Sequence, residues 1–250
     1  MKTLIFDVTG EFAHFRKFNT TSSPLTYLIP TRTAVAGLLG AIVGFGREEF
    51  YDYFLREKAE IAIQAKNKLT KQGYAFNLIN TKEGMNRIKN RTQVKFEFVA
   101  QPHYRVFFTH TDASIYDDIK SRIQEKRFFF QPYLGLAQLT ADLVYVDEVE
   151  SHEKKSSGFV EIISAVNLKK CTGTKIEIDP DLKYSSAIMP IEMSLDLLDP
   201  LNAKMGKTVL PKNRKTDEYA EVVFEVSGRP VKVETETYHE LENYGNILFL

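Results

Sequence analysis

The 250-residue chain has a single cysteine, Cys171, so it can form no disulfide bond within itself. A chain of this length buries a substantial core without covalent staples, and a lone cysteine favours a reducing cytoplasm. The sequence has no cysteine cluster and no His-x-x-x-His spacing, so nothing in it supports a zinc site. We therefore expect a cytoplasmic protein without a metal or another cofactor.

The sequence also lacks long apolar runs. Residues 1–10 carry Asp7 and have neither the apolar core nor the small-residue cleavage site of a signal peptide. The longest apolar run, residues 33–46, has about 14 residues, which is too short to span a bilayer. We interpret this run as a buried helix and expect no association with a membrane.

The net charge is zero. The chain therefore lacks the overall excess of positive charge that would favour a nucleic-acid partner. The charges are nevertheless segregated. Residues 64–105 contain nine basic and two acidic residues, and residues 204–215 contain five basic residues and no acid. Acidic residues gather instead in 141–153. Such segregation indicates a basic patch on a neutral protein, although a solvated basic face explains the composition as well.

Periodicity predicts an α+β fold in the first part of the chain. Two helices are expected: one begins at Thr31 or Thr33 and is capped by that threonine, and the other spans 111–127 with Asp112 or Ser114 as its cap. Alternating apolar residues predict strands, at 2–10, 60–66, 74–80, 93–100, 104–110 and 142–148. This order resembles a ferredoxin-like βαββαβ unit with an insertion between its middle strands.

The pattern changes beyond Ser151. Short β-like runs follow one another without a convincing helix, and the polar stretch 152–158 marks the change. We therefore divide the chain into a ferredoxin-like domain, residues 1–150, and a β-rich C-terminal part, residues 151–250.

Two stretches of the sequence resemble chemical motifs, a phosphate-binding loop and a pair of candidate catalytic histidines. Residues 205–208 read MGKT, but a phosphate-binding loop needs a further glycine where the chain has Leu201, and Pro211 follows, so nucleotide hydrolysis is excluded. His103 and His110 flank one predicted strand. A metal-independent ribonuclease can be built from a histidine base with a lysine and a tyrosine, but lone histidines at strand ends are more often ordinary surface residues.

Several sequence blocks together resemble the Cas-five family of CRISPR-associated proteins, in particular its type I-B branch. The blocks are GEFAHFRKF (10–18), TYLIPTRTAVAGLLGAIVGF (26–45), FNLINTK (76–82), NRTQVKFEFVAQPHYRVFF (90–108) and QPYLGLAQLTADLVYV (131–146). They occur in the family's order, and the resemblance extends from Lys2 to about Val146.

The resemblance implies a modified RNA-recognition, ferredoxin-like domain of the RAMP superfamily with a thumb inserted at about Gln64 to Phe96. It implies a subunit of the type I surveillance complex called Cascade, which acts in antiviral defence. This subunit would grip the 5′ handle of the CRISPR RNA (crRNA) and cap the backbone filament. Its neighbours would be a backbone subunit of the Cas-seven family and the large subunit that reads the PAM, and it would meet target DNA only indirectly.

A single-stranded handle needs positive charge for its phosphates and flat side chains for its unstacked bases. A helix N-terminus also favours a phosphate, and a glycine turn lets RNA approach main-chain amides. On these grounds we predict RNA contacts by Arg16, Lys17, Tyr27, Thr31, Arg32, Thr33, Lys66, Lys68, Phe76, Arg87, Lys89, Arg91, Tyr133 and Gly135. Arg32 could instead serve the fold by pairing with an acid such as Asp7, Phe76 could be a core residue, and the glycine turn could be a simple connection.

Type I-C relatives cleave crRNA precursors themselves, with a tyrosine and an adjacent lysine–histidine pair. Here His103 stands between Pro102 and Tyr104, without a neighbouring lysine. We therefore predict a non-catalytic RNA-binding protein. The alternative is a metal-independent endoribonuclease that uses His103 or His110.

Overall fold

A computed structural model describes residues 1–21, 23–46, 49–79, 90–173, 175–196 and 213–250. Its centre is a six-stranded sheet in the order β17-β16-β9-β1-β8-β5. Four of these strands and two helices follow one another as β1 (Lys2–Thr9), α1 (Arg32–Val43), β5 (Ala59–Ala65), β8 (His103–His110), α2 (Ala113–Glu125) and β9 (Asp142–Lys155). Neighbouring strands among these four are antiparallel. The order β9-β1-β8-β5 is the ferredoxin-like arrangement, which confirms the predicted α+β fold class.

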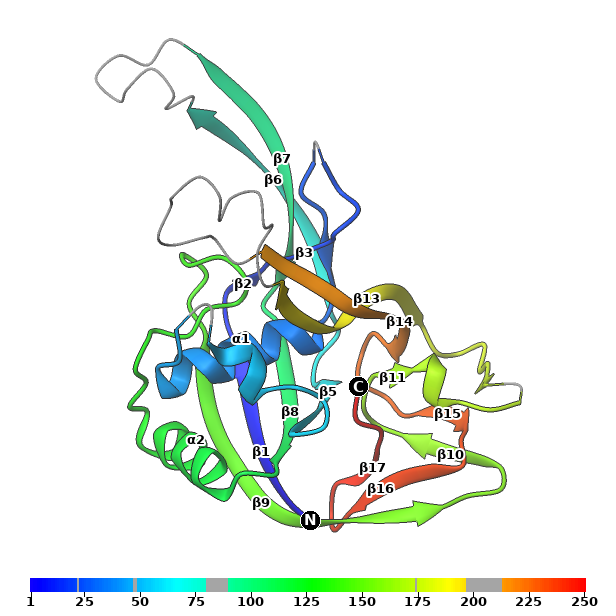
Figure 1. Ribbon diagram of the computed structural model, residues 1–250. Coiled ribbons are helices and arrows are strands. Elements are labelled where there is room, and N and C mark those ends of the chain that lie inside the picture. The colour runs from blue at the N-terminus through cyan, green and yellow to red at the C-terminus, as the bar shows by residue number, and fades with distance from the viewer. Residues whose placement is uncertain (22, 47–48, 80–89, 174, 197–212) are drawn as a thin grey trace.

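Alternation along β1 explains why the sheet is covered on both faces. Leu4, Phe6 and Val8 point into the core that contains the buried faces of both helices. Ile5 points the other way, into a second cluster with Phe107 and the C-terminal segment. The helices therefore cover one face, and the end of the chain covers the other (Figure 1).

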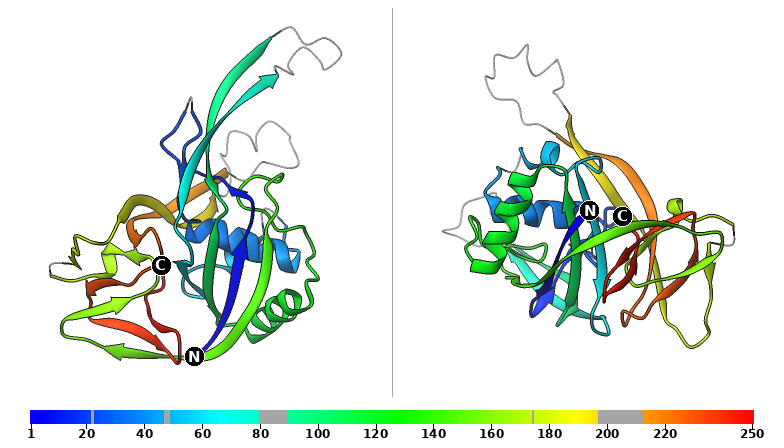
Figure 2. Two further views of the ribbon diagram at one scale, coloured as in Figure 1. Left: turned by 180° about the vertical axis from the view of Figure 1, so that it is seen from behind. Right: turned by 90° about the horizontal axis from the view of Figure 1, so that it is seen from below.

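The inserted thumb is a long hairpin that stands out from the body (Figures 1 and 2). Its strands are β6 (Thr70–Ile79) and β7 (Arg91–Ala100), and β2 (Phe12–Ala13) adds to β7. The insertion lies between the middle strands, as predicted, but its bounds differ. Gln64 and Ala65 complete β5 by pairing with β8, and β7 continues to Ala100 before the chain returns to the sheet.

The C-terminal part is β-rich, as predicted. It contains β10 (Phe159–Ile162), β11 (Val166–Asn167), β12 (Ile176–Glu177), β13 (Tyr184–Asp196), β14 (Asn213–Glu225), β15 (Val231–Glu234), β16 (Thr237–Leu241) and β17 (Gly245–Ile247). The shorter elements are β3 (Phe15–Arg16), β4 (Thr26–Tyr27) and the 3-10 turns η1 (Phe50–Tyr53) and η2 (Leu168–Lys170).

The predicted boundary between residues 150 and 151 falls inside strand β9. The first half of β9 pairs with β1, and its second half pairs with β16. Met189, Ile191 and Val222 also pack in the same core cluster as Leu4. The division into 1–150 and 151–250 therefore does not separate two cores. Within the described ranges, no helix has the length and apolarity that crossing a membrane requires.

Candidate nucleic-acid interface

A hollow of about 1360 Å³ opens between helix α1, the thumb and the turn that leads into β9. This volume exceeds the roughly 300–1,000 Å³ of pockets that hold one small molecule. Its lining comes from α1 (Ala34, Gly37, Leu38, Ala41), from the thumb (Leu78, Val94, Phe96) and from the turn (Phe130, Tyr133, Gly135, Leu136). The hollow is thus mostly apolar and aromatic.

The N-terminus of α1 forms one wall of this hollow. Thr31 caps the helix, because its Oγ1 accepts a hydrogen bond from the Ala34 amide at 3.1 Å. Thr31 and Thr33 both line the hollow, and their hydroxyl oxygens are 2.9 Å apart. The first amides of a helix have no acceptor within it, and the helix dipole makes this end positive. The wall therefore suits an anionic group, and the RNA contacts of Thr31 and Thr33 stay a prediction.

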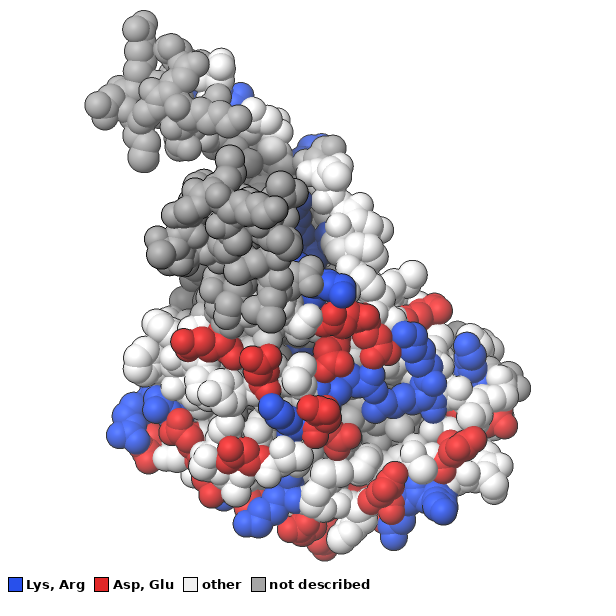
Figure 3. Space-filling model, viewed as in Figure 1, with Lys and Arg blue, Asp and Glu red and all other residues white. Residues whose placement is uncertain are grey.

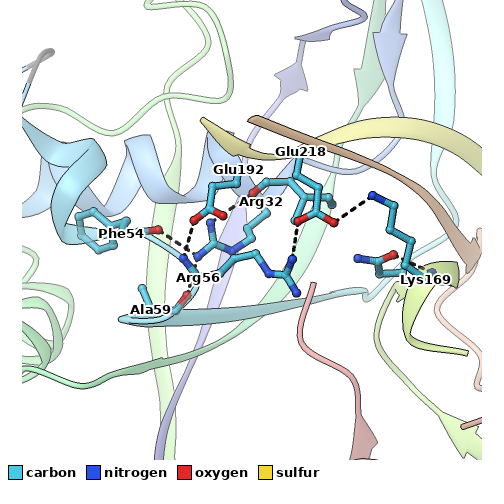
Figure 4. Close-up of polar contacts among 9 residues, drawn as sticks. Arg32, Phe54, Arg56, Ala59, Lys169, Glu192 and Glu218 are labelled. Atoms are coloured by element: carbon cyan, nitrogen blue, oxygen red, sulfur yellow. Dashed lines mark hydrogen bonds and ion pairs between the residues drawn. The ribbon is translucent and has the colours of Figure 1, made fainter. Parts of the chain in front are cut away.

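The side chain of Arg32 does not share this role. It is only 2% exposed, and its guanidinium points into the protein (Figure 4). Nη2 donates to the carbonyl oxygens of Phe54 at 2.9 Å and Ala59 at 2.6 Å, and Nη1 donates to that of Ile191 at 3.2 Å. Burial lowers the pKa of Arg32 to about 10. The predicted RNA contact by the Arg32 side chain is therefore wrong, and the arginine serves the fold.

Ionic contacts around Arg32 join β13 and β14 to the body (Figure 4). The Arg56 amide donates to Glu192 Oε1 at 2.8 Å. Glu218 accepts from Arg56 Nη1 at 2.5 Å and from Lys169 Nζ at 3.1 Å. Because Glu192 lies on β13 and Glu218 on β14, these contacts fix the hairpin that brings Met193 and Arg214 to the hollow.

Tyr27 is also a structural residue. It is 2% exposed, and its hydroxyl donates to the carbonyl oxygen of Ile188 at 2.8 Å. The predicted RNA contact by Tyr27 is therefore wrong, because both its ring and its hydroxyl are occupied by the protein. Its ring instead supports Lys17, whose Nζ lies 5.8 Å from the ring centroid. The neighbouring Arg16 is exposed and lines the hollow.

The glycine turn has a backbone that only glycine fits. Gly135 has a φ of 91°, and a Cβ at this position would lie 1.9 Å from the carbonyl oxygen of His14. The turn is held against this segment, because the His14 amide donates to Leu134 at 3.0 Å. Tyr133 and Gly135 both face the hollow, and Tyr133 is 45% exposed. The structure thus places both predicted residues of the turn at the hollow, and their contacts with RNA stay a prediction.

The thumb has two chemically different faces. Directly opposed residues such as Tyr74 and Phe96, or Phe76 and Val94, share one face. On this aromatic face, successive rings contact one another with centroids 5.4 Å apart for Phe12 and Tyr74 and for Phe76 and Phe96. Phe76 is 44% exposed, so it is not a core residue. The other face carries Lys71, Lys95 and Arg91.

Of the predicted basic residues that the structure describes, Arg16 alone lines the hollow. Lys66 and Lys68 are exposed between β5 and β6, and Arg91 lies on the thumb face opposite Phe76. Arg87 and Lys89 lie outside the described residues, as does most of 204–215. Of that segment, Arg214 lines the hollow, and Lys215 is 3.8 Å from Asp217.

Sequence reasoning missed the apolar part of the site. Leu78, Val94 and Phe96 line the hollow together with the outward face of α1. The available signal was the two-residue period of the thumb strands, which separates aromatic from basic positions. The apolar outward face of α1 was visible too, but nothing local showed which segments it would meet.

The two histidines of the ribonuclease alternative differ. His110 is held by both ring nitrogens: Nδ1 accepts from the Asp112 amide at 2.9 Å, and Nε2 lies 2.8 Å from the carbonyl oxygen of Tyr53. His103 Nε2 is 3.0 Å from Asp7 Oδ2. Arg105 holds the same carboxylate with bonds of 2.7 and 2.9 Å. Of these two histidines, His103 alone keeps a ring nitrogen without a hydrogen-bond partner among the described residues.

The family model described as CRISPR-associated protein (Cas_Cas5) matches residues 3–188. A search of curated proteins found no match. Among solved structures, a CRISPR protein from Archaeoglobus fulgidus is 12% identical with a TM-score of 0.57, over 99% of this chain and 98% of that one.

Two further chains match with lower scores. One belongs to a CRISPR RNA-guided surveillance complex, at 13% identity and a TM-score of 0.47, over 91% of each chain. The other is in a structure of the Type III-B Cmr-beta bound to cognate target RNA and AMPPnP, at 13% identity and a TM-score of 0.49, over 93% and 86% of the two chains. The archaeal protein shows a shared fold, and the family model covers well over half of the sequence, so this chain belongs to the Cas-five family of CRISPR-associated proteins.

Proposed function

We propose that this protein is a non-catalytic, RNA-binding subunit of a type I-B CRISPR surveillance complex and that its hollow holds the 5′ handle of the crRNA. The observation that carries the proposal is the convergence of three features on one surface. These are the N-terminus of α1, the glycine turn with Tyr133, and the aromatic face of the thumb. Membership of the Cas-five family supports a CRISPR role.

The chemistry of the hollow fits a single strand better than a duplex. Unstacked bases need flat apolar side chains, and Phe96, Phe130 and Tyr133 provide these. The phosphates need donors, and the helix N-terminus with Arg16 and Arg214 provides them. A duplex would hide its bases and leave the aromatic lining unused.

The proposal also includes the protein's neighbours in the complex and its relation to target DNA. In a complex of this kind the guide reads sequence by base pairing, and the protein grips backbone and shape. A subunit that holds the handle marks one end of the guide, so it would cap the filament of Cas-seven backbone subunits and adjoin the large PAM-reading subunit. Target DNA would then reach this protein only through the guide and those neighbours.

Binding of labelled handle RNA to the purified full-length chain tests the proposal. We expect Arg16→Gln to weaken binding and Tyr133→Ala to lower the affinity about tenfold, since one base–aromatic stack contributes roughly 1–3 kcal/mol. Phe159→Ala is the matched control, because Phe159 is an exposed aromatic of the body at 46% against 45% for Tyr133. Equal affinities for Tyr133→Ala and Phe159→Ala would contradict the proposed site.

The endoribonuclease remains a second candidate because of one contact that the sequence did not show. The Lys66 amide donates to the His103 carbonyl at 2.8 Å, so a lysine lies beside the histidine in space. Burial lowers the pKa of Lys66. If this pair were catalytic, the protein would cut CRISPR repeat RNA at one position without metal, and His103→Asn would abolish the cut. We expect no cleavage, because Arg105 already neutralises the Asp7 carboxylate that would orient His103.

A further inference from the structure

His14 lines the hollow, and the proposed function gives it no role. It lies between β2 and β3, and only 2% of it is exposed. Its main chain is fixed against the glycine turn, because its amide donates to the carbonyl oxygen of Leu134 at 3.0 Å. Its own carbonyl oxygen packs so closely against Gly135 that no side chain fits there. His14 therefore has a fixed place beside the turn.

The imidazole ring of His14 is held in one orientation and in one tautomer. Its Nδ1 lies 2.7 Å from the carbonyl oxygen of Glu97. A carbonyl oxygen can only accept a hydrogen bond, so Nδ1 carries the proton and donates. The rings of Phe96 and Phe98 contact the imidazole, with centroids 5.7 and 5.6 Å away. In a neutral imidazole with its proton on Nδ1, the other nitrogen, Nε2, is an acceptor.

This acceptor has no partner in the protein and stays accessible. Nε2 makes no hydrogen bond to any residue that the structure describes. The described polar atoms that are buried without a partner are Arg32 Nε, Asn167 Nδ2 and His239 Nδ1. Nε2 of His14 is not one of them, and His14 lines the hollow, so a ligand reaches Nε2 from there. Burial lowers the pKa of His14 below its ordinary value of 6.5, which keeps the ring neutral at pH 7.

Figure 3 shows a surface on which acidic and basic side chains are interspersed over the body, so charge alone selects no nucleic acid there. A neutral acceptor inside the hollow is different in kind, because it needs a donor from the ligand.

The donor that this position favours is the 2′-hydroxyl of a ribose. Phosphate oxygens only accept hydrogen bonds, whereas the 2′-hydroxyl and the amino groups of bases donate them. The elements around His14 suit the sugar–phosphate backbone rather than a base. Gly135 lets a backbone approach the turn that packs against His14, and Arg16, two residues further along, lines the hollow and suits a phosphate. A sugar lies between successive phosphates, so a ribose is the group beside Nε2.

We propose that Nε2 of His14 accepts a hydrogen bond from the 2′-hydroxyl of one handle nucleotide and thereby makes the hollow prefer RNA to DNA. The inference rests on the proposed function and adds a specificity-determining residue to it. DNA lacks this hydroxyl and would leave Nε2 without a donor. The contact is to the sugar, so the preference does not depend on which base that nucleotide carries.

Two substitutions separate the two nitrogens of His14. The amide of asparagine replaces Nδ1, so His14→Asn keeps a donor for the Glu97 carbonyl oxygen and removes the acceptor in the hollow. The longer His14→Gln places its amide oxygen near the position of Nε2. Affinities of the full-length variants for labelled handle RNA and for DNA of the same sequence are measured at one salt concentration. We expect His14→Asn to lower the RNA affinity about fivefold, as for one neutral hydrogen bond, and to leave the DNA affinity unchanged. His14→Gln should keep the preference, and so should the control His152→Asn, at an exposed histidine of the body.

Modified RNAs test the unaltered protein, so this readout does not depend on the folding of a variant. Each handle nucleotide is replaced in turn by its 2′-deoxy or 2′-fluoro form. The fluorine keeps the sugar conformation of RNA but cannot donate a hydrogen bond. At one position both replacements should lower the affinity about fivefold, and in His14→Asn they should have no effect there.

Two results would overturn the inference. One is an equal loss of RNA and DNA affinity in His14→Asn, which would assign His14 to a base contact or to the fold. The other is unmodified affinity for every 2′-fluoro RNA. Loss of handle binding in Tyr133→Ala is scored separately. Binding that depends on Tyr133 but not on the 2′-hydroxyl would overturn this inference alone, whereas binding that is independent of Tyr133 would contradict the proposed site itself.

Discussion

At the scale of single residues, Arg32 shows how a charged side chain can be committed to the fold. Its guanidinium donates to three carbonyl groups, of Phe54 just after η1, Ala59 in β5 and Ile191 in β13, and among the described residues it has no ion pair. The free energy gained from these bonds offsets the cost of burying the charge. The sequence placed Arg32 at a helix N-terminus, where an anion contact is plausible. It could not show that Ile191, 159 residues away, would cover that position.

We expect Arg32→Met to destabilise the protein without removing RNA binding from the folded molecules. Methionine keeps much of the length of the side chain but leaves three buried carbonyl groups without their donor. Each unsatisfied group costs about 1–3 kcal/mol, so the loss should be at least about 3 kcal/mol. Urea unfolding measures the loss, and titration with handle RNA at low temperature measures the affinity of the folded fraction. Arg16→Met, at an exposed position, is the control. A stable Arg32→Met protein with lost RNA affinity would return Arg32 to the binding site.

The lowered pKa of Asp7 predicts how the stability of the folded protein depends on pH. Burial raises the pKa of Asp7, but hydrogen bonds from Arg105 and His103 outweigh burial, and the net pKa lies below its ordinary value of 3.8. A carboxyl group with a lowered folded-state pKa stabilises the protein above its ordinary pKa. This contribution is lost as the pH falls from about 4 through the lower folded-state value.

Asp7→Asn should therefore destabilise the protein at pH 7 by about 2 kcal/mol, since bonds to a charged group contribute about 1.5–3 kcal/mol. The difference from the unaltered protein should shrink below about pH 4, where the carboxylate is protonated. Urea unfolding at several pH values measures both quantities. Asp118→Asn removes an exposed pair with Arg122 and should have little effect at any pH. A difference that stays constant from pH 7 to pH 3 would show that the charge of Asp7 is not what stabilises the fold.

At the scale of elements, the periodicity of the sequence was sufficient to predict the main helices and strands. It was not sufficient to predict which of these elements contact one another. The apolar stripe of α2 was readable because that helix has one buried face. The strands β1, β5 and β8 were readable as runs of apolar residues, and most of these residues are buried on both faces of the sheet. The two-residue strands β2, β3 and β4 were not readable, because each is too short to show a period and exists only through its pairing partner. The thumb strands were recognised, yet their basic and aromatic residues were assigned to one surface. The pairing of Tyr74 with Phe96, and of Ala75 with Lys95, places them on two.

The candidate site likewise has parts that local sequence signals predict and parts that they do not. Thr31, Thr33, Tyr133 and Gly135 were found because helix starts and glycine turns carry local signals. Their convergence on one hollow with Phe96 depends on tertiary packing, which no local signal contains. The prediction selected Lys66, Lys68 and Arg91 for their charge alone. The charge of a side chain does not indicate to which surface it points.

At the scale of the whole molecule, residues 1–150 and residues 151–250 contribute to the same hydrophobic clusters. Ile5, Ala62 and Phe107 on the outer face of the sheet are covered by Leu241, Ile247 and Phe249. Strand β9 crosses the predicted boundary without a break and pairs with β16 beyond it. Each part of the chain therefore supplies one side of a core that both parts share, and a third cluster, around Ile162, Val231 and Val233, lies within the C-terminal part.

We therefore expect the full-length chain to unfold in one cooperative transition and a fragment of residues 1–150 to lack a fixed tertiary structure. The fragment would expose the apolar outer face of its sheet and lose Met189 and Ile191 from the helix-side core. Near-ultraviolet circular dichroism and urea unfolding of both forms measure this. Adding the fragment of residues 151–250 is the complementary experiment, since it should restore a cooperative transition by rebuilding the shared core. A 1–150 fragment that unfolds cooperatively by itself would show that residues 1–150 have an independent core and that the contacts with β13, β14 and the C-terminal segment are an interface between domains.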